Sequence, residues 1–548
     1  MKERAITFFL LLIVGLASYS NCFNVFIPAD NYSHFYLFDK GFLQGLYESS
    51  LTASPYFSGF PVMHFFYTLF HYTPVPWVGL GIFFHVINAF LVYLITSLLL
   101  KHITLYKYFL CFFSALVFLL SPYQVESVLW GAVSVRWLFH ALTFLWCIYI
   151  LLLYFINPTT QKIILIHSLF ALALFSNETA FVLPIIGSVL FFFFKKNGNN
   201  HVSVKNYLKQ IICFQIILIA SFFILNKLYI GNWFWHGGTF EEIANPSISI
   251  KTGLKYLAKF FLFYRYLPYQ LWDGYLRNIA ENHLLLFILF FSIVFLLALI
   301  LKKAIQTKKN IVHLIAIFFI CFLFMLVPVL PLDSSFLSYY YPDRYGYIAS
   351  AFFYPFLVIS IYFLFPKKHL FISSAYVIIC FVFLIQTTAI WKASNDYCNK
   401  LIQGFHPFLK YNNIYVLNET EYYKGVAAFR STLAENIHYK YEGYPPEKIK
   451  IISGAYQDSF SDSIIFVSIN ETQNKIVVKS TPKQTPYFCT GGWPKSYLNS
   501  EYEVVFDTTG CSYEVTFKNK IPLGSVFLYI NGGEWEKAEP LYNISSEN

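Results

Sequence analysis

The chain has 548 residues, of which 57% are hydrophobic and only 12% are charged. A soluble globular domain carries roughly 25% charged residues, so this composition excludes an ordinary soluble protein and indicates an integral membrane protein. The net charge of +10 comes largely from short lysine-rich loops. We therefore interpret it as a signal of membrane topology rather than of nucleic-acid binding.

Apolar segments that are long enough to cross a bilayer recur from the N-terminus onward. A transmembrane helix needs about 20 predominantly apolar residues. The first candidate resembles a signal peptide, but no clear small-residue cleavage site follows it, so we expect an uncleaved helix. We predict about eleven spans, at residues 5–23, 77–100, 107–121, 137–155, 162–176, 180–194, 209–230, 282–301, 310–328, 345–365 and 369–390.

Basic residues mark alternate loops between these segments. Cytoplasmic loops of membrane proteins are enriched in lysine and arginine, and all of the marked loops fall on one side when the N-terminus is cytoplasmic. We therefore predict a bacterial inner (plasma) membrane protein whose C-terminal region is extracytoplasmic. The marking residues are Lys2, Arg4, Lys101, Lys107, Lys162, Lys195, Lys196, Lys205, Lys302, Lys303, Lys308, Lys309, Lys367 and Lys368.

Two regions depart from the pattern of spans. Segment 251–272 is apolar but contains several lysines and arginines, so we predict an interfacial or re-entrant amphipathic helix. Beyond about residue 411, short β-rich segments alternate with turn residues. The sequence thus predicts an α-helical polytopic domain over 1–395 and a small extracytoplasmic β-rich domain over 396–548, in which Cys489 and Cys511 either pair as a disulfide or stay free thiols.

Ionisable residues beside the apolar segments gather at the predicted outer face. Such residues are costly at a membrane and often mark a functional site, so we expect one polar site there. The residues on that side are Asp30, Glu126, Arg136, Glu178, Arg265, Asp273, Asp333, Asp343 and Arg344.

Asp30 lies in the first outer loop, which we place at about residues 24–76. A carboxylate that is partly desolvated at a membrane surface can act as a general base. The alternative is a helix N-cap. His34 follows four residues later, a spacing at which the two side chains can share a divalent cation if further ligands join them; we expect no other cofactor.

Three further outer-face groups have both a functional and a structural interpretation. Glu126 and Arg136 flank the start of a span, where arginine can bind a phosphate or simply extend to the interface. Glu178 lies in a tight turn and is either a site residue or a helix cap. Arg344, after Asp343, is either a second anion contact or an interfacial anchor.

Four short motifs together resemble those of the membrane glycosyltransferases of the C superfamily. The likeness is to the protein O-mannosyltransferase-like enzymes, including the transmembrane O-mannosyltransferases that act on cadherins. Here Asn31 follows Asp30 where the animal proteins have consecutive acidic residues, Asn177 replaces a lysine, and a β-rich tail replaces the tetratricopeptide repeats. The motifs are Pro122-x3-Glu126-x-Val128-x-Trp130-x5-Arg136, Ser176-x-Glu178-x-Ala180-x3-Pro184, Asp343-Arg344-Tyr345-x-Tyr347 and His85-x2-Asn88.

The resemblance implies an inverting glycosyltransferase that uses a polyprenyl-phosphate sugar, with mannose as the suggested sugar, at the extracytoplasmic face of the cell envelope. A protein serine or threonine is the expected acceptor. Asp30, Glu126 and Glu178 are the expected catalytic residues, and Arg136, Arg344 and Arg265 the expected phosphate ligands. His85, Asn88, Trp130, Asp343 and Tyr345 are expected to support them, although a buried His85 bonded to a neighbouring helix is also a sufficient explanation for that residue.

Other functions fit part of this pattern. The same donor chemistry could act on a glycolipid or an envelope polysaccharide. A transporter or flippase for a lipid-linked substrate would also use charges at the membrane edge, but it would favour repeated halves and charges near the midplane. A non-catalytic membrane scaffold is the third alternative.

The predicted topology can be tested directly. A reporter that is active only outside the cytoplasm should be active when fused after Asn548, because the odd span count places that end across the membrane. Reporter fusions after the lysine-rich loops serve as cytoplasmic controls. Activity of a cytoplasm-specific reporter at Asn548 would contradict the span count and the predicted location of the site.

Overall fold

The computed structural model describes residues 2–52, 57–100, 106–198, 200–231, 233, 246–266, 309–331, 343–457, 465–470, 474–480, 486–489, 495–507, 510–522 and 524–539. These residues form two compact units. The first contains residues 2–24 and the described part of 37–388, and the second contains residues 25–36 and the described residues from 389 onward.

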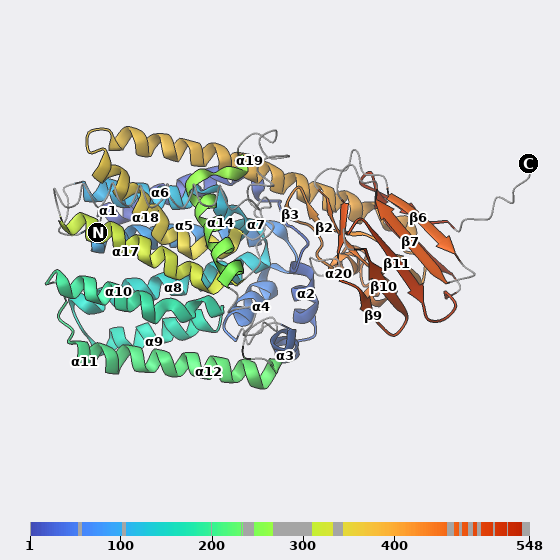
Figure 1. The fold of residues 1–548 in the computed structure, drawn as a ribbon, viewed down its shortest axis with the longest axis horizontal. Helices are drawn as coiled ribbons and strands as arrows, with labels where there is room; N and C mark the ends of the chain where they lie inside the picture. The colour runs from blue at the N-terminus through green and yellow to red at the C-terminus, as the bar shows by residue number, and fades with distance from the viewer. Residues whose placement is uncertain are drawn as a thin grey trace, which may run out of the picture. The chain divides into compact units, whose positions relative to one another are not determined.

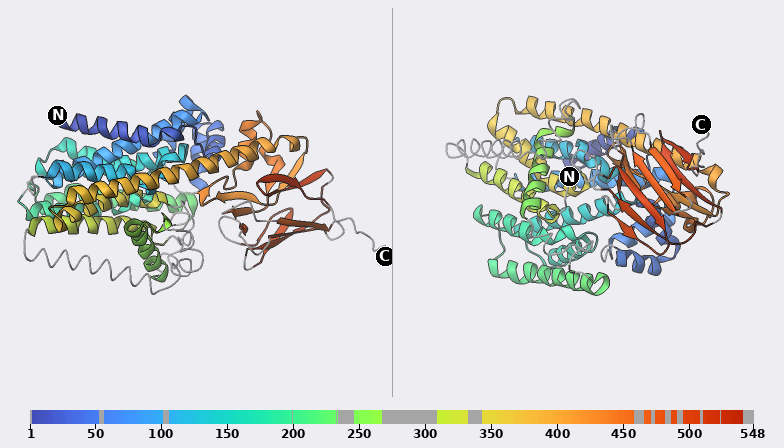
Figure 2. Two further views of the ribbon diagram at one scale, coloured as in Figure 1. Left: turned by 90° about the horizontal axis from the view of Figure 1, so that it is seen from above. Right: turned by 45° about the vertical axis from the view of Figure 1, so that its right-hand side comes forward.

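The first unit is helical, and its long helices lie side by side in one bundle (Figures 1 and 2). The boundary between the units falls within α2 (Asn31–Asp39) and α19 (His369–Gly404). The other helices of the first unit are α1 (Lys2–Ser18), α3 (Phe42–Thr52), α4 (Gly59–Phe70), α5 (Pro74–Leu99), α6 (Lys107–Leu120), α7 (Val125–Leu129), α8 (Ala132–Ile156), α9 (Thr160–Leu174), α10 (Leu183–Lys196), α11 (Val204–Tyr207), α12 (Cys213–Ile230), α14 (Pro246–Leu262), α17 (Lys309–Leu326) and α18 (Tyr347–Leu364).

Seven helices among the described residues are long and apolar enough to cross a membrane. The bent pair α6 and α7 would be an eighth. Helices α1 (17 residues) and α9 (15 residues) overlap predicted spans but are shorter than the seven helices. The predicted span 282–301 lies outside the described residues. A multi-pass helical membrane protein is therefore supported, and the total of eleven spans stays a prediction. The seven are Pro74–Leu99, Ala132–Ile156, Glu178–Lys196, Val204–Ile230, Asn310–Val329, Asp343–Leu364 and His369–Phe408.

Helix α18 is enclosed by the rest of the bundle, whereas α12 lies at its periphery. In the most apolar 18-residue window, 83% of the residues of Asp343–Leu364 are buried, compared with 17% for Val204–Ile230. Side chains at the start of α18 are therefore removed from solvent by protein, and any charge there needs a partner within the bundle.

Part of the predicted interfacial segment 251–272 is helical. Helix α14 covers Pro246–Leu262 and is followed by a short 3₁₀ helix at Tyr264–Tyr266. In both views α14 runs across the direction of the long helices (Figures 1 and 2). It is not among the seven candidate spans, which leaves the interfacial interpretation in place.

The second unit contains the β-rich part of the chain. Three sheets are present among its described residues, with strand orders β13-β12-β1-β4, β6-β7-β11-β10-β9 and β3-β2-β5-β8. It also contains α20 (Leu433–Lys440). The strands are β1 (Asn413–Val416), β2 (Glu419–Tyr423), β3 (Val426–Ala427), β4 (Ile449–Ile451), β5 (Gly454–Gln457), β6 (Ile465–Asn470), β7 (Lys475–Ser480), β8 (Pro486–Cys489), β9 (Tyr497–Leu498), β10 (Tyr502–Phe506), β11 (Ser512–Phe517), β12 (Ser525–Asn531) and β13 (Glu534–Lys537).

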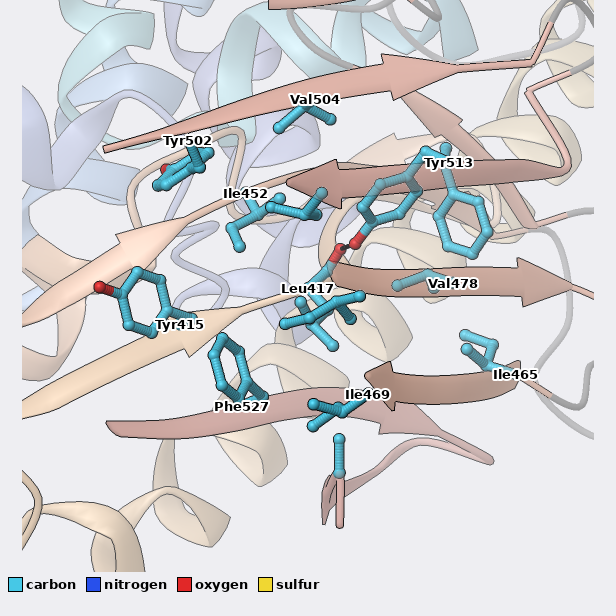
Figure 3. Packing of buried hydrophobic residues seen from close by; sticks show 14 of the residues in the cluster. Tyr415, Leu417, Ile452, Ile465, Ile469, Val478, Tyr502, Val504, Tyr513 and Phe527 are labelled. Atoms are coloured by element: carbon cyan, nitrogen blue, oxygen red, sulfur yellow. Dashed lines mark hydrogen bonds between the residues drawn. The ribbon is translucent and has the colours of Figure 1, made fainter. Parts of the chain in front are cut away.

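Alternating apolar residues of these strands build the core of the second unit (Figure 3). Strand β10 shows the pattern most clearly, because its residues alternate between buried and exposed along Tyr502–Phe506. Val478 and Val504 are completely buried, and the hydroxyl of Tyr513 donates to the carbonyl oxygen of Leu417. The β-rich C-terminal region predicted from the sequence is thus confirmed.

The two cysteines of this region do not form a disulfide. Cys489 is buried at the end of β8, and Cys511 is partly exposed just before β11. Of the two alternatives left open by the sequence, the structure has the one without the disulfide.

Candidate functional site

The position of Glu126 depends on a break in the helix before it. Helix α6 ends at Leu120, and the side chain of Ser121 accepts a hydrogen bond from the amide of Tyr123 (3.3 Å). The chain then turns by 55° into α7, which carries Glu126. Gly81 of α5 permits this arrangement, because a Cβ atom there would lie 2.6 Å from the carbonyl oxygen of Val128.

Glu126 binds Arg344 through both of its carboxylate oxygens. Oε1 accepts from the guanidinium Nη1 of Arg344 (2.6 Å), and Oε2 accepts from the backbone amide of Arg344 (2.7 Å). The Arg344 guanidinium also lies 4.3 Å from the ring centre of Trp130 and 4.5 Å from that of Tyr345. Both charges are buried, with side-chain exposures of 1% for Glu126 and 7% for Arg344, so a charged and aromatic environment holds the Arg344 side chain in one position.

Asp343, the neighbour of Arg344, is the centre of a second group of charges. Arg265 donates two hydrogen bonds to its carboxylate, from Nη1 to Oδ2 at 2.7 Å and from Nη2 to Oδ1 at 2.8 Å. Lys259 of α14 forms an ion pair with the same carboxylate. The side chains of all three residues are at most 4% exposed.

Among the described residues, the ion pairs of this region involve more cations than carboxylates. We call Glu126, Asp343, Arg344, Arg265 and Lys259 the buried ion cluster; its ion pairs join two carboxylates to three cations. Burial lowers the pKa of Lys259, and the nearby Asp343 opposes that shift. An additional anion beside Lys259 would therefore favour its charged form.

Two of the three predicted phosphate ligands are thus already paired with carboxylates. The guanidinium group of Arg265 binds Asp343, and that of Arg344 binds Glu126. Sequence reasoning did not single out Lys259. The sequence did contain a signal, because Lys255 and Lys259 are one helical turn apart in an otherwise apolar segment. Both lysines are buried in the structure.

Tyr345, which lies against the Arg344 guanidinium, is linked through Trp137 and His140 to Thr179. Trp137 packs against Tyr345 (5.6 Å between ring centres) and against His140 (6.2 Å). His140 in turn bonds to the hydroxyl of Thr179 (2.8 Å). Arg136 and Glu178 are the sequence neighbours of Trp137 and Thr179, so both belong to the same part of the bundle.

The turn at Glu178 is capped by its neighbour. The side chain of Asn177 accepts a hydrogen bond from the amide of Thr179 (3.0 Å), and this is the interaction that a cap makes. Glu178 itself is buried, with 5% exposure. The capping alternative for Glu178 therefore applies to Asn177 instead.

His85 and Asn88 both contact the hydroxyl of Tyr347. His85 Nδ1 lies 2.7 Å from that oxygen and Asn88 Nδ2 lies 3.2 Å from it, while His85 Nε2 lies 3.1 Å from the carbonyl oxygen of Leu119. A carbonyl only accepts, so Nε2 carries the proton and Nδ1 accepts from Tyr347. This network links α5 to α18 and fits the structural interpretation of His85.

Asp30 belongs to the second unit, although the sequence grouped it with the membrane-spanning domain. Its carboxylate Oδ2 accepts a hydrogen bond from Nη1 of Arg430 (2.6 Å). Its backbone has a φ of +53°, whereas an N-cap residue normally has an extended backbone. The Oδ2 atom of the carboxylate thus serves an ion pair.

Two buried glutamates lie near this ion pair. Burial, with a smaller contribution from Asp30, raises the pKa of Glu421 to about 7, and Arg430 opposes the shift. Burial also raises the pKa of Glu419 to about 8, against the effect of the amides that it binds. The second unit therefore contains carboxyl groups that titrate near neutral pH.

No group of three or more histidine, cysteine, aspartate or glutamate residues in the described part of the chain could hold a metal ion. The predicted Asp30 and His34 pair has no third ligand of these types among the described residues. Asp273 and Asp333, two of the predicted outer-face acids, lie outside the described residues.

No protein-family model matches the chain, and a search of curated proteins finds no match. The residues themselves therefore carry any functional assignment. Of the predicted site residues, the structure joins Glu126, Arg265, Asp343 and Arg344 with Trp130 and Tyr345 in one cluster, and it places Asp30 in the other compact unit.

The Glu126–Arg344 pair should contribute strongly to stability. Glu126→Gln leaves the buried Arg344 charge without its counter-ion, and breaking a buried pair in this way costs about 3–5 kcal/mol. We expect a correspondingly lower free energy of unfolding in denaturant titrations of the purified protein. Glu534→Gln is the matched control, because its pair with Lys400 is exposed and should have no measurable effect. Equal stability of the two variants would contradict the assigned role of the pair.

Proposed function

We propose that this protein is an inverting glycosyltransferase that moves a sugar, with mannose the first candidate, from a polyprenyl-phosphate donor to a hydroxyl acceptor at the extracytoplasmic membrane face. The buried ion cluster carries the proposal. Among the described residues its ion pairs join three cations to two carboxylates, and the phosphodiester of such a donor carries one negative charge. Cations at this place would attract the donor phosphate.

The chemistry of the leaving group fits the same cluster. The acceptor oxygen forms a bond to the anomeric carbon as the bond from that carbon to the phosphate oxygen breaks, and the phosphate leaves with the electron pair. Negative charge therefore grows on the phosphate in the transition state. Cations that are already fixed in place stabilise this charge without reorganising. We assign the role to Lys259 of the cluster, whose ammonium has three donors and can bind a phosphate in addition to Asp343, and to Arg136, which lies outside the cluster.

The acceptor hydroxyl must lose its proton during the same step. We assign this proton to the carboxylate of Asp30, which becomes a neutral acid as the new bond forms. Glu126 holds Arg344 and so orients the cluster, and Glu178 is assigned to the sugar hydroxyls. In this proposal the isoprenoid tail of the donor stays among the apolar helices and lipids, so the protein needs no soluble sugar nucleotide.

The acceptor is a protein serine or threonine in this proposal. Mass spectrometry of envelope proteins and glycans from cells with and without the protein identifies it. Loss of hexose from protein hydroxyls supports protein glycosylation, and loss from a glycolipid or polysaccharide replaces the acceptor while keeping the donor chemistry. An unchanged glycan profile contradicts glycosyl transfer.

Asp30→Asn tests the general base. The substitution keeps the size of the side chain but removes proton acceptance, and general base catalysis is worth about 10²–10⁴-fold. We expect a loss of that size in the transfer rate of labelled sugar in membranes, at normal protein levels. Asp39→Asn, nine residues later and bonded to the hydroxyl of Tyr67, is the control. A near-normal rate for Asp30→Asn would remove Asp30 from the mechanism.

Lys259→Gln and Arg136→Lys test the phosphate contacts. A hydrogen bond to a charged group contributes about 1.5–3 kcal/mol, which is roughly tenfold to a hundredfold in affinity. We expect losses of this size for Lys259→Gln and smaller ones for Arg136→Lys, which keeps the charge but loses the fork. The measurement is binding of a polyprenyl-phosphate sugar to purified variants, with exposed Lys400→Gln as control. Unchanged binding in both variants would eliminate the phosphate role.

A further inference from the structure

Residues 25–36, which include Asp30, are attached to the C-terminal part of the chain by several independent contacts within the second unit. The amide of Phe26 donates to the side-chain oxygen of Asn395 (2.9 Å), and the amide of Ala29 donates to the carbonyl of Ala428 (2.8 Å). The ring of Tyr32 packs against that of Tyr439 at 5.6 Å. Among the residues that the structure describes, the contact that holds the Asp30 carboxylate itself is the ion pair with Arg430.

The backbone on both sides of this ion pair has an uncommon conformation. Asp30, Arg430 and Ser431 have φ angles of +53°, +49° and +64°, a region that residues other than glycine adopt only when the surroundings impose it. Glu419 imposes it at Ser431, because its two carboxylate oxygens accept the amides of Ser431 (2.7 Å) and Leu433 (2.8 Å). Arg430 is therefore presented to Asp30 from a fixed loop.

A buried carboxyl group, that of Glu421, also interacts with the positive charge of Arg430. Glu421 of β2 interacts electrostatically with both Arg430 and Asp30 and bonds to Cys489 of β8. Its side chain fills the space beside Gly454 of β5, where any Cβ atom would collide with it. Among the described residues, the charged and titratable groups that act on Glu421 are Arg430, Asp30 and Cys489, and Glu419 lies two residues away on the same strand.

We propose that Arg430 is a positioning residue for the catalytic carboxylate of Asp30, and that ionised Glu421 becomes the counter-ion of Arg430 when Asp30 accepts the proton of the acceptor hydroxyl. The inference rests on the proposed function and deepens it. When Asp30 becomes neutral, the guanidinium loses its counter-ion, and an ionised Glu421 supplies another. The proton itself stays on Asp30 in this step, and Glu421 changes only the energy of placing it there.

This arrangement predicts the direction of a pH effect. Since the pKa of Glu421 is raised to about 7, Glu421 is neutral below that pH and ionised above it. Protonation of Asp30 beside Arg430 is therefore easier above that pH, and the transfer rate should rise as the pH passes through about 7. The phosphodiester of the donor does not change its protonation state near pH 7, so the donor would not cause this rise in the transfer rate.

The attachment can be measured without any activity. Hydrogen exchange of the amides of residues 25–36 in the full-length purified protein should be faster in Arg430→Met than in wild type, and Arg430→Lys should restore part of the protection. Lys424→Met is the matched control, because Lys424 also has a positive φ (+49°) but its side chain is exposed. Equal exchange in wild type and Arg430→Met would overturn the positioning role.

The kinetic experiment uses transfer from a polyprenyl-phosphate sugar in membranes. Arg430→Met should lower kcat roughly tenfold to a hundredfold, the effect of one charged hydrogen bond, while KM for the donor stays unchanged, and Arg430→Lys should recover part of the rate. Glu421→Gln should abolish the rise near pH 7 and keep the rate at the low-pH level. An unaltered pH profile in Glu421→Gln, or a change confined to KM in Arg430→Met, would overturn the proposal.

The two experiments separate this inference from the function on which it rests. Faster exchange in Arg430→Met, together with no sugar transfer by wild type, contradicts glycosyl transfer but leaves the attachment of Asp30 intact. Normal transfer by wild type with no effect of Arg430→Met contradicts only the positioning role.

Discussion

Charges buried within an apolar helical bundle are stable only when oppositely charged groups surround them. In this protein two adjacent residues of opposite charge, Asp343 and Arg344, precede the enclosed helix α18, and each takes its partner from a different segment. Arg344 binds Glu126 of α7, and Asp343 binds Arg265 and Lys259. These pairs attach the start of α18 to the bent pair α6–α7 and to the transverse helix α14, so the arrangement of this end of the bundle depends on them.

The same constraint gives the cluster its chemical character. Here the ion pairs join three cations to two carboxylates, and aromatic rings lie against the Arg344 guanidinium. In the function that we propose, a lipid-linked phosphate binds here, because it suits both the cations and the apolar surroundings.

Asp30 has a different environment from the acids of the ion cluster. Its ion pair with Arg430 is partly exposed, with 33% exposure of the Asp30 side chain and 24% of the Arg430 side chain. A partly exposed carboxylate can exchange protons and meet a substrate, whereas the fully buried Glu126 is committed to its partner. Environment alone therefore divides the predicted catalytic acids into one that can take part in proton transfer and one that holds an arginine in place.

The sequence by itself determined the class of the protein, since long apolar segments and short β-rich segments depend on local composition and periodicity, which tertiary contacts do not change. It also identified Glu126, Asp343 and Arg344 as unusual, because a charge beside an apolar segment is costly wherever the segment folds. Only the tertiary structure decided the partners. Asp30 and Arg430 are 400 residues apart, and no local pattern records a pairing at that separation. For the same reason the sequence could not show that the guanidinium groups of Arg265 and Arg344 bind carboxylates. Lys259 is a candidate site residue only because α14 places it beside Asp343.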